Sequence, residues 1–205
     1  MLEQTLDQFT KTLISEAEHR HKLDPSIPPE KHGLNFAQQV FENTCSVSEM
    51  LSSSDCRSGC GHCCTLYVSV LPVEAEVIAD QLNRMPQKLR EETLVRIAEN
   101  ADLEQLGVDD YIRAKTPCAF LNLKSRMCRI YEIRPMACRG YDSQDVRMCI
   151  DAISEPDKGT PRTLELIQLS TNMNIAITAM LEHFAVSSNI MPLHSAVFRY
   201  TGAST

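Results

Sequence analysis

The sequence lacks the features that would place the protein in a membrane, in a fibre or outside the cell. No apolar run approaches the ~18 to 20 residues needed to cross a bilayer, and the stretch around residues 66–71 is far shorter. There is no low-complexity tract, and the content of 43% hydrophobic and 23% charged residues is ordinary for a globular chain. The N-terminal residues show no basic start and no unbroken apolar stretch of a secretion signal. We therefore expect a cytoplasmic protein that does not enter a membrane.

An excess of positive charge is also missing. The chain has 20 Lys and Arg against 27 Asp and Glu, which gives a net charge of −7. Such a field repels phosphate backbones, so we expect no nucleic-acid partner, whereas a protein partner is compatible with an acidic surface. The sequence contains no GxSxG, P-loop, HExxH or dinucleotide fingerprint. It therefore assigns no catalytic residue.

The chain length suits a single hydrophobic core. We expect one domain over residues 1–205, in which a cysteine-cluster, metal-binding core at 56–149 is flanked by helical scaffold at 1–51 and 160–186. All nine cysteines lie between Cys45 and Cys149, which confines the chemistry to the middle of the chain.

Hydrophobic periodicity predicts helices in both flanks. Apolar residues recur at steps of three and four over residues 2–17, and a second helix is expected over about 35–51. The proline-rich stretch 24–33 between them is expected to be an irregular connector. The last long helix is expected to begin at Thr160 and Pro161.

The middle of the chain predicts shorter elements. Pro72 and Pro86 each suit the start of a helix. The short apolar runs 118–121 and 127–131 are joined by polar residues and predict a β-hairpin that brings Cys118 and Cys128 together. The expected fold class is therefore mainly α with a small β-hairpin, with irregular loops around a cysteine-ligated metal centre.

The cysteine count points to metal binding or redox chemistry. In a reducing compartment a disulfide framework is not expected, and roughly 4% cysteine is below the ~8 to 10% of small secreted scaffolds. Gly59 and Gly61 allow the first cysteine segment to turn tightly. Eight thiols would supply two tetrahedral metal ions. They form two groups in the sequence: Cys56, Cys60, Cys63 and Cys64, followed by Cys118, Cys128, Cys138 and Cys149.

The adjacent pair Cys63 and Cys64 limits how these thiols are shared. Neighbouring side chains point to opposite faces of a strand, or about 100° apart on a helix. We therefore expect the pair not to bind one metal ion together. Two nearby sites, one site with spare cysteines, and a polynuclear cluster all remain open.

Arginines accompany the cysteines and would balance thiolate charge. A divalent ion with four thiolates carries a charge of about −2, which is unfavourable in an acidic protein without cations nearby. We expect Arg129, Arg134 and Arg139 to donate hydrogen bonds to sulfur. Arg57 and Arg126 are equally well explained as surface residues.

Three linked motifs carry a family resemblance. The segments Cys56-x3-Cys60-x2-Cys63-Cys64, Pro117-Cys118-x-Phe120-Leu121 and Cys128-x-Ile130-Tyr131-Glu132-x-Arg134-Pro135-x-x-Cys138-Arg139 are similar to the YkgJ-type cysteine-cluster family of zinc- or iron-chelating proteins. The resemblance implies a metal-chelating core with ligands Cys56, Cys60, Cys63, Cys64, Cys118, Cys128 and Cys138. Cys149 lies outside these motifs, and its assignment depends on the count of eight. Cys45 is expected to be a buried structural thiol.

Several uses of the thiols remain open. Zinc would make the protein a chelating or structural module, whereas an iron–sulfur cluster would make it a redox protein or an oxidoreductase. Cys60-Gly61-His62-Cys63 also has the spacing of a thiol–disulfide oxidoreductase. The spacing Cys56-x3-Cys60-x2-Cys63 is that of radical S-adenosylmethionine enzymes, which are usually βα barrels. His62 is expected to point to solvent.

Overall fold

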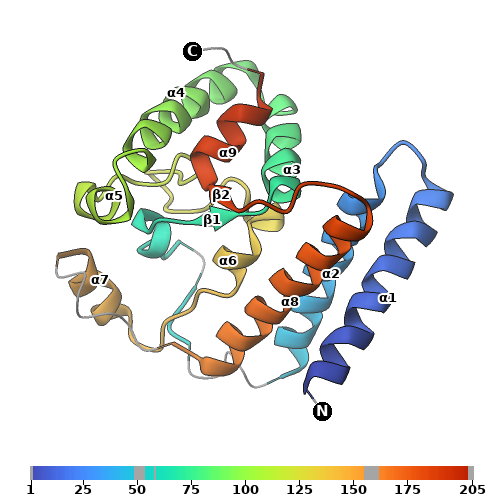
Figure 1. Ribbon diagram of the computed structural model, residues 1–205. Helices are drawn as coiled ribbons and strands as arrows, with labels where there is room; N and C mark the ends of the chain where they lie inside the picture. Colours follow the sequence, from blue (N-terminus) through green and yellow to red (C-terminus); the bar gives the residue numbers. More distant parts are fainter. Residues whose placement is uncertain (1, 49–53, 58, 155–161, 203–205) are drawn as a thin grey trace.

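The computed structural model describes the chain except for residues 1, 49–53, 58, 155–161 and 203–205 (Figure 1). The described part is mainly helical with one small antiparallel sheet, which confirms the expected fold class. Two groups of helices lie side by side, and the cysteine-bearing segments lie between and below them (Figure 1).

The first group is a layer of three helices, α1 (Leu2–Leu23), α2 (Pro29–Val47) and α8 (Leu164–His183). They share one hydrophobic cluster, as the periodicity of residues 2–17 predicts. Gly33 permits the close approach of α2 and α8, because a Cβ at this position would lie 2.1 Å from the Met180 sulfur. The buried members of the cluster include Leu13, Ala17, Leu34, Phe41, Met173 and Met180.

Two details of this layer differ from expectation or cannot be compared with it. The connector over residues 24–33 is shorter than expected, because α2 begins at Pro29, where a proline fits the first helical turn. The expected start of the last long helix at Thr160 and Pro161 lies outside the described residues.

The second group contains α3 (Pro72–Asn83), α4 (Gln87–Glu104), α5 (Val108–Ala114) and α9 (Leu193–Tyr200). Helices α3, α4 and α9 pack with the 118–130 segment around a second hydrophobic cluster. The helix starts predicted at Pro72 and Pro86 are confirmed: Pro72 is the first residue of α3, and Pro86 directly precedes α4.

The sheet consists of β1 (Ser69–Val70) and β2 (Met191–Pro192), which pair antiparallel. The predicted hairpin is present only as a single antiparallel bridge between Leu121 and Cys128. One hydrogen bond beside it, from Asn122 N to Met127 O at 2.9 Å, holds the turn. The predicted approach of the two segments is therefore confirmed, but they are too short to form strands.

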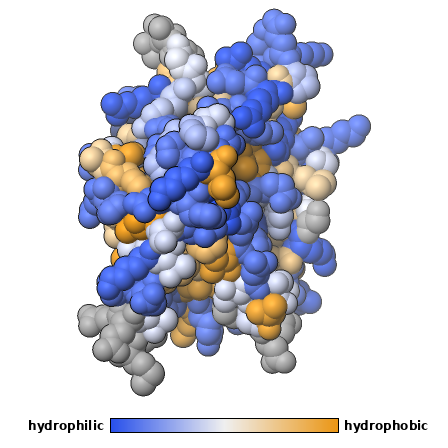
Figure 2. Space-filling model, turned by 90° about the vertical axis from the view of Figure 1, so that its right-hand side faces the viewer, coloured by the Kyte–Doolittle hydropathy of each residue, from blue (hydrophilic) through white to orange (hydrophobic). Residues whose placement is uncertain are grey.

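The cysteine-rich middle of the chain also contains four short elements: η2 (Cys63–Thr65), η3 (Tyr131–Ile133), α6 (Met136–Arg139) and α7 (Val146–Ser154). Three of them, η2, α6 and α7, together carry four of the nine cysteines. Figure 1 shows α6 between the two helical groups and α7 at the edge of the molecule. Viewed from the α1 side, the surface is mostly hydrophilic with apolar side chains gathered near its middle (Figure 2). No described helix combines the length and the apolar character needed to cross a bilayer.

Candidate metal centre

Four thiols from separate segments meet beside the hairpin turn. The Cys118 amide donates to the Cys64 carbonyl at 2.6 Å, so the first cysteine segment lies directly against the second. The bridge between Leu121 and Cys128 returns the chain to the same place. The thiols of Cys63, Cys118, Cys128 and Cys138 all lie close enough for a charge on one to act on the others. We refer to these four as the inner group.

Three further thiols meet where α7 begins. The Asp55 amide donates to the Ser143 carbonyl at 2.9 Å, and the Asp55 carboxylate accepts from the Val146 amide at 3.0 Å. These bonds tie the segment of Cys56 to the first turn of α7. The thiol of Cys149 lies close enough to those of Cys56 and Cys60 for their charges to interact. We refer to Cys56, Cys60 and Cys149 as the outer group.

Ser143 connects two members of the outer group. Its amide donates to the Cys56 sulfur at 3.3 Å, and its hydroxyl hydrogen-bonds with the Cys149 thiol. Ser143 is buried. Cys149, the expected ligand that no motif supported, is thus beside cysteines of the first motif.

The pair Cys63 and Cys64 departs from expectation. The two residues lie in the 3-10 turn η2, and their thiols are hydrogen-bonded to each other. The expectation that the side chains point apart is therefore wrong. It assumed a regular strand or α-helix, whereas Cys64 has ψ near 19°, outside both.

Gly61 makes the tight turn before Cys63 possible. Its φ of +58° lies in the left-handed region, where residues with a Cβ are strained. A Cβ here would also lie 2.9 Å from the Leu121 side chain and 3.0 Å from the Arg126 carbonyl. The glycine thus permits the tight turn that its position among the cysteines predicts, and the turn lies directly against Leu121 and Arg126.

Burial keeps the inner thiols protonated at neutral pH. It raises the pKa of Cys118 and of Cys128 to about 11 each, against the opposing charges of Arg96 and Arg134 respectively. Burial also raises the pKa of Cys138 well above its ordinary value. The hydrogen bond with Cys64, and then burial, raise the pKa of Cys63. Thiolate formation here therefore needs a strong cation such as a metal ion.

The three expected arginines lie near the cysteines, but in different roles. Arg139 is buried and donates to Glu42, to the Glu132 carbonyl and, at 2.9 Å, to the Arg134 carbonyl. It therefore holds the turn before α6. The guanidinium of Arg129 approaches the Thr93 hydroxyl at 3.5 Å.

Among the three arginines expected from the sequence, Arg134 is the one whose charge lowers the pKa of inner thiols. It lowers the pKa of Cys63 and of Cys128, although the causes that raise both are larger. Its guanidinium lies over the Tyr131 ring at 4.1 Å and 3.5 Å from Glu42. Its Nε is buried with no hydrogen-bond partner in the described part of the chain. The Arg134 guanidinium thus has a positive charge and an unpaired Nε–H group that could donate a hydrogen bond to a thiolate.

Two positioning groups are absent from the sequence expectations. Arg96 on α4 donates to the carbonyls of Cys118 at 2.7 Å and of Leu121 at 2.8 Å. His194 on α9 accepts from the Ala119 amide at 3.3 Å through Nε2, and its Nδ1 bonds to Glu104 at 2.8 Å. Both fix the backbone around Cys118. No local pattern predicts the pairing of His194 with Glu104, because the two lie 90 positions apart.

Glu74 positions the segment of Cys138. Its buried carboxylate accepts from the Leu71 amide at 2.9 Å and from the Met136 amide at 2.7 Å. One side chain thus satisfies the first turns of both α3 and α6, whose amides have no partner within their helices. Because α6 carries Cys138, Glu74 sets where this thiol lies.

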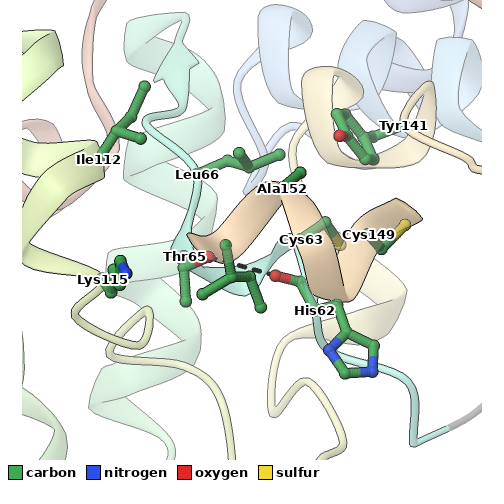
Figure 3. A pocket seen from close by; sticks show the side chains of 10 residues that line it. His62, Cys63, Thr65, Leu66, Ile112, Lys115, Tyr141, Cys149 and Ala152 are labelled. Carbon is green, nitrogen blue, oxygen red and sulfur yellow. Dashed lines mark hydrogen bonds between the residues drawn. The ribbon is translucent and has the colours of Figure 1, made fainter. Parts of the chain in front are cut away.

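Cys45 and His62 do not join the thiol groups as candidate ligands. Cys45 is buried in the hydrophobic cluster of α1, α2 and α8. Figure 3 shows the His62 ring directed away from the sulfurs of Cys63 and Cys149.

A pocket of about 30 Å³ lies beside the thiols (Figure 3). The residues that line it include His62, Cys63, Lys115 and, from α7, Cys149 and Ala152. This volume accommodates about two water molecules.

Two alternative uses of the first motif gain no support from its surroundings. In thiol–disulfide oxidoreductases the reactive thiolate lies at a helix N-terminus that stabilises it, whereas the next described element after Cys60 is a turn of three residues that begins at Cys63. The described residues contain a single sheet of two strands, so no βα barrel surrounds the motif.

The thiols fit a metal in their chemistry, but they are not yet arranged as ligands. Cysteine sulfur is the donor that zinc and iron–sulfur centres prefer. In the described part of the chain, no three or more His, Cys, Asp or Glu side chains already surround a point that would hold an ion. Binding therefore requires the protonated side chains to rotate and lose protons, as expected for a site that forms with its metal.

Comparison with known proteins gives one match. Residues 55–159 match the family model "CxxCxxCC: Putative zinc- or iron-chelating domain", which spans half of the chain. The chain belongs to the CxxCxxCC family. The match contains both the inner and the outer group, and Cys45 lies outside it. Membership of the CxxCxxCC family supports metal binding as the general property of this protein. No curated protein and no solved structure matches the chain.

Proposed function

We propose that the protein chelates zinc or iron through cysteine thiolates, with ligands drawn from the inner group, the outer group and Cys64. The observation that carries this proposal is the convergence of thiols from separate segments. Cys63 lies close enough to interact with Cys56, Cys149 and the rest of the inner group. The cluster forms within the single domain that we expect over residues 1–205, at the 56–149 core.

The surroundings of the cluster favour chelation over catalysis. Burial makes a thiolate without a cation unfavourable. A metal ion that binds the thiolates supplies the missing positive charge and stabilises them. Arg134 supplies positive charge and a spare Nε donor beside Cys63 and Cys128. The pocket beside the thiols is small, with a volume of about 30 Å³. We therefore place a redox-inert divalent ion first and an iron–sulfur centre, with electron transfer as its use, second.

The experiment is a comparison of ligand and control variants. Cys128→Ser and Cys138→Ser should each lose bound metal and become less stable, because each removes a thiol from the inner group. Cys45→Ala is the matched control: it removes a buried thiol outside the family match, and it should keep its metal. All proteins are purified without oxygen and without an affinity metal column, and metal is measured per chain. Full metal content in both ligand variants would refute the proposal.

A further inference from the structure

A surface groove lies between helix α4 and the hairpin turn, apart from the pocket beside the thiols. It has a volume of about 570 Å³, is open to solvent, and has no cysteine among the described residues that line it. Helix α4 forms one wall, and the hairpin segment forms the other. The lining residues are Glu92, Val95 and Arg96 of α4, together with Asn122, Leu123, Lys124 and Arg129 of the hairpin segment.

Hydrogen bonds hold the two walls of the groove in place. Arg96 donates to the Leu121 carbonyl at 2.8 Å, which joins α4 to the hairpin segment. Within the turn, the Asn122 side chain accepts from the amides of Lys124 and Ser125 at 3.0 and 3.1 Å. The groove is therefore formed before a ligand binds, which lowers the entropy cost of binding.

Positive charge prevails in the groove, although the chain as a whole is acidic. Three cations, Arg96, Lys124 and Arg129, line it against the single carboxylate of Glu92. None of the three forms an ion pair with a residue that the structure describes. Arg96 donates to backbone carbonyls, and the Arg129 guanidinium approaches the Thr93 hydroxyl at 3.5 Å. These partners are neutral, so they leave the positive charge uncompensated.

Apolar side chains line the same groove. Val95 and Leu123 are 59% and 58% exposed. A small-molecule site encloses most of its ligand, whereas this groove is open along its length. It suits an extended segment whose carboxylates pair with the cations and whose apolar side chains cover Val95 and Leu123. Clusters of arginine recognise acidic motifs in this way.

We propose that this groove binds an acidic peptide segment of a partner protein. The inference goes beyond metal chelation and does not depend on it, because no lining residue is a proposed metal ligand. The net charge of −7 repels an acidic partner from the chain as a whole, so attraction is confined to the groove. Complementary charge in one place thus fixes where the segment binds.

Fluorescence anisotropy of a labelled peptide tests the groove. The probe is a peptide of alternating glutamate and leucine, and the comparison peptide has glutamine in place of every glutamate. The reduced full chain should bind the glutamate peptide about tenfold more tightly, because only its carboxylates pair with the three cations. Added salt should weaken binding of the glutamate peptide far more than binding of the glutamine peptide.

Variants of the lining residues locate the bound peptide. Lys124→Glu should weaken binding by about fivefold or more, and Arg129→Gln by about two- to fivefold, because each removes an ion pair. Glu92→Gln should tighten binding by about twofold, because it removes the carboxylate that repels the peptide. The matched control is Lys22→Glu, which makes the same charge change at an exposed position of α1 and should bind as wild type.

The outcomes decide both the site and its occupant. Equal affinity for the two peptides, or no binding at millimolar peptide, would overturn the proposal. Equal weakening in Lys124→Glu and Lys22→Glu would show that net charge alone matters, and would also overturn it. Citrate that binds as tightly as the peptide would assign the groove to a small anion instead. A wild-type dimer that Lys124→Glu dissociates would make the occupant a second copy of this chain. Metal content measured in each variant keeps this test separate from that of chelation.

Discussion

Glu104 gives the sharpest stability prediction, because its carboxylate is buried and fully hydrogen-bonded. It accepts from the amide and Nδ1 of His194 at 3.0 and 2.8 Å, and from the amide and hydroxyl of Ser195 at 2.8 and 2.7 Å. In Glu104→Gln an NH₂ group replaces one carboxylate oxygen. This group can only donate, so it cannot accept the hydrogen bonds that the oxygen accepted. The Ser195 hydroxyl can rotate to accept from it, but one buried amide stays without a partner.

The magnitude follows from these bonds. Hydrogen bonds to charged groups contribute about 1.5–3 kcal/mol, and an unsatisfied buried amide costs about 1–3 kcal/mol, so we expect a loss of about 3 kcal/mol. For a chain of this length the midpoint of thermal unfolding should fall by about 6–12 °C. The pairing also holds the Nε2 acceptor for Ala119, so zinc affinity should fall as well.

The pH dependence gives a second, independent signature. Burial alone would raise the pKa of Glu104, but the hydrogen bonds that it accepts from His194 and from the Ser195 amide together lower the pKa below the ordinary value of 4.5. The carboxylate therefore stabilises the fold fully above pH 4.5, and this contribution is lost as the pH falls through the lowered pKa. Glu104→Gln lacks this acid-sensitive contribution, so its stability should vary less with pH below 4.5.

Urea unfolding of the metal-free protein on both sides of pH 4.5 measures both effects. The control is Asp102→Asn, an exposed carboxylate two positions away on the same helix, which should change stability by less than about 0.5 kcal/mol. The reasoning fails if Glu104→Gln is as stable as the control at neutral pH. If the free energy of unfolding changes equally with pH in wild type and in Glu104→Gln, Glu104 is not the source of the acid sensitivity.

Three further predictions concern the thiol segments. Zinc affinity should rise with pH and binding should release protons, because two inner thiols have a pKa of about 11; calorimetry in buffers of different ionisation enthalpy would show it, and a pH-independent affinity would contradict it. Gly61→Ala should destabilise by about 2–4 kcal/mol through left-handed strain and overpacking, and by more than Gly202→Ala, which shares the positive φ in open space. Denaturant midpoints compare the two, and equal losses would contradict the crowding around Gly61. Glu74→Ala should cost about 2–3 kcal/mol and weaken zinc binding, whereas Glu76→Ala, which breaks only a partly exposed pair with Lys31, should cost at most about 1 kcal/mol. Matching unfolding curves for these two variants would show that Glu74 does not hold α6.

The sequence predicted those helices and turns that depend on residues near one another in the chain. The apolar period of residues 2–17 and the prolines at 72 and 86 set helices that the structure confirms. The sequence likewise predicted that Gly59 and Gly61 let the first cysteine segment turn tightly, and both glycines have a positive φ in the structure.

The remaining features depend on partners far apart in the chain. Arg139 binds Glu42, which lies 97 positions earlier, so its proximity to Cys138 in the sequence gave no guide to its hydrogen bonds. His194 meets Glu104 and Ala119 only once α9 has packed on α4. The hydrogen-bonded pair Cys63 and Cys64 depends on a 3-10 turn that neither a helical nor a strand pattern describes.

The most direct test of chelation by thiolates is the metal content of wild type purified without oxygen, measured with its absorption spectrum. We predict about one to two zinc or iron ions per chain. Zinc without visible absorption would establish the divalent site, whereas iron with matching sulfide and a broad band in the visible would establish an iron–sulfur centre. A chain that is free of both metals, and stays free when either is added to the reduced protein, would contradict the account.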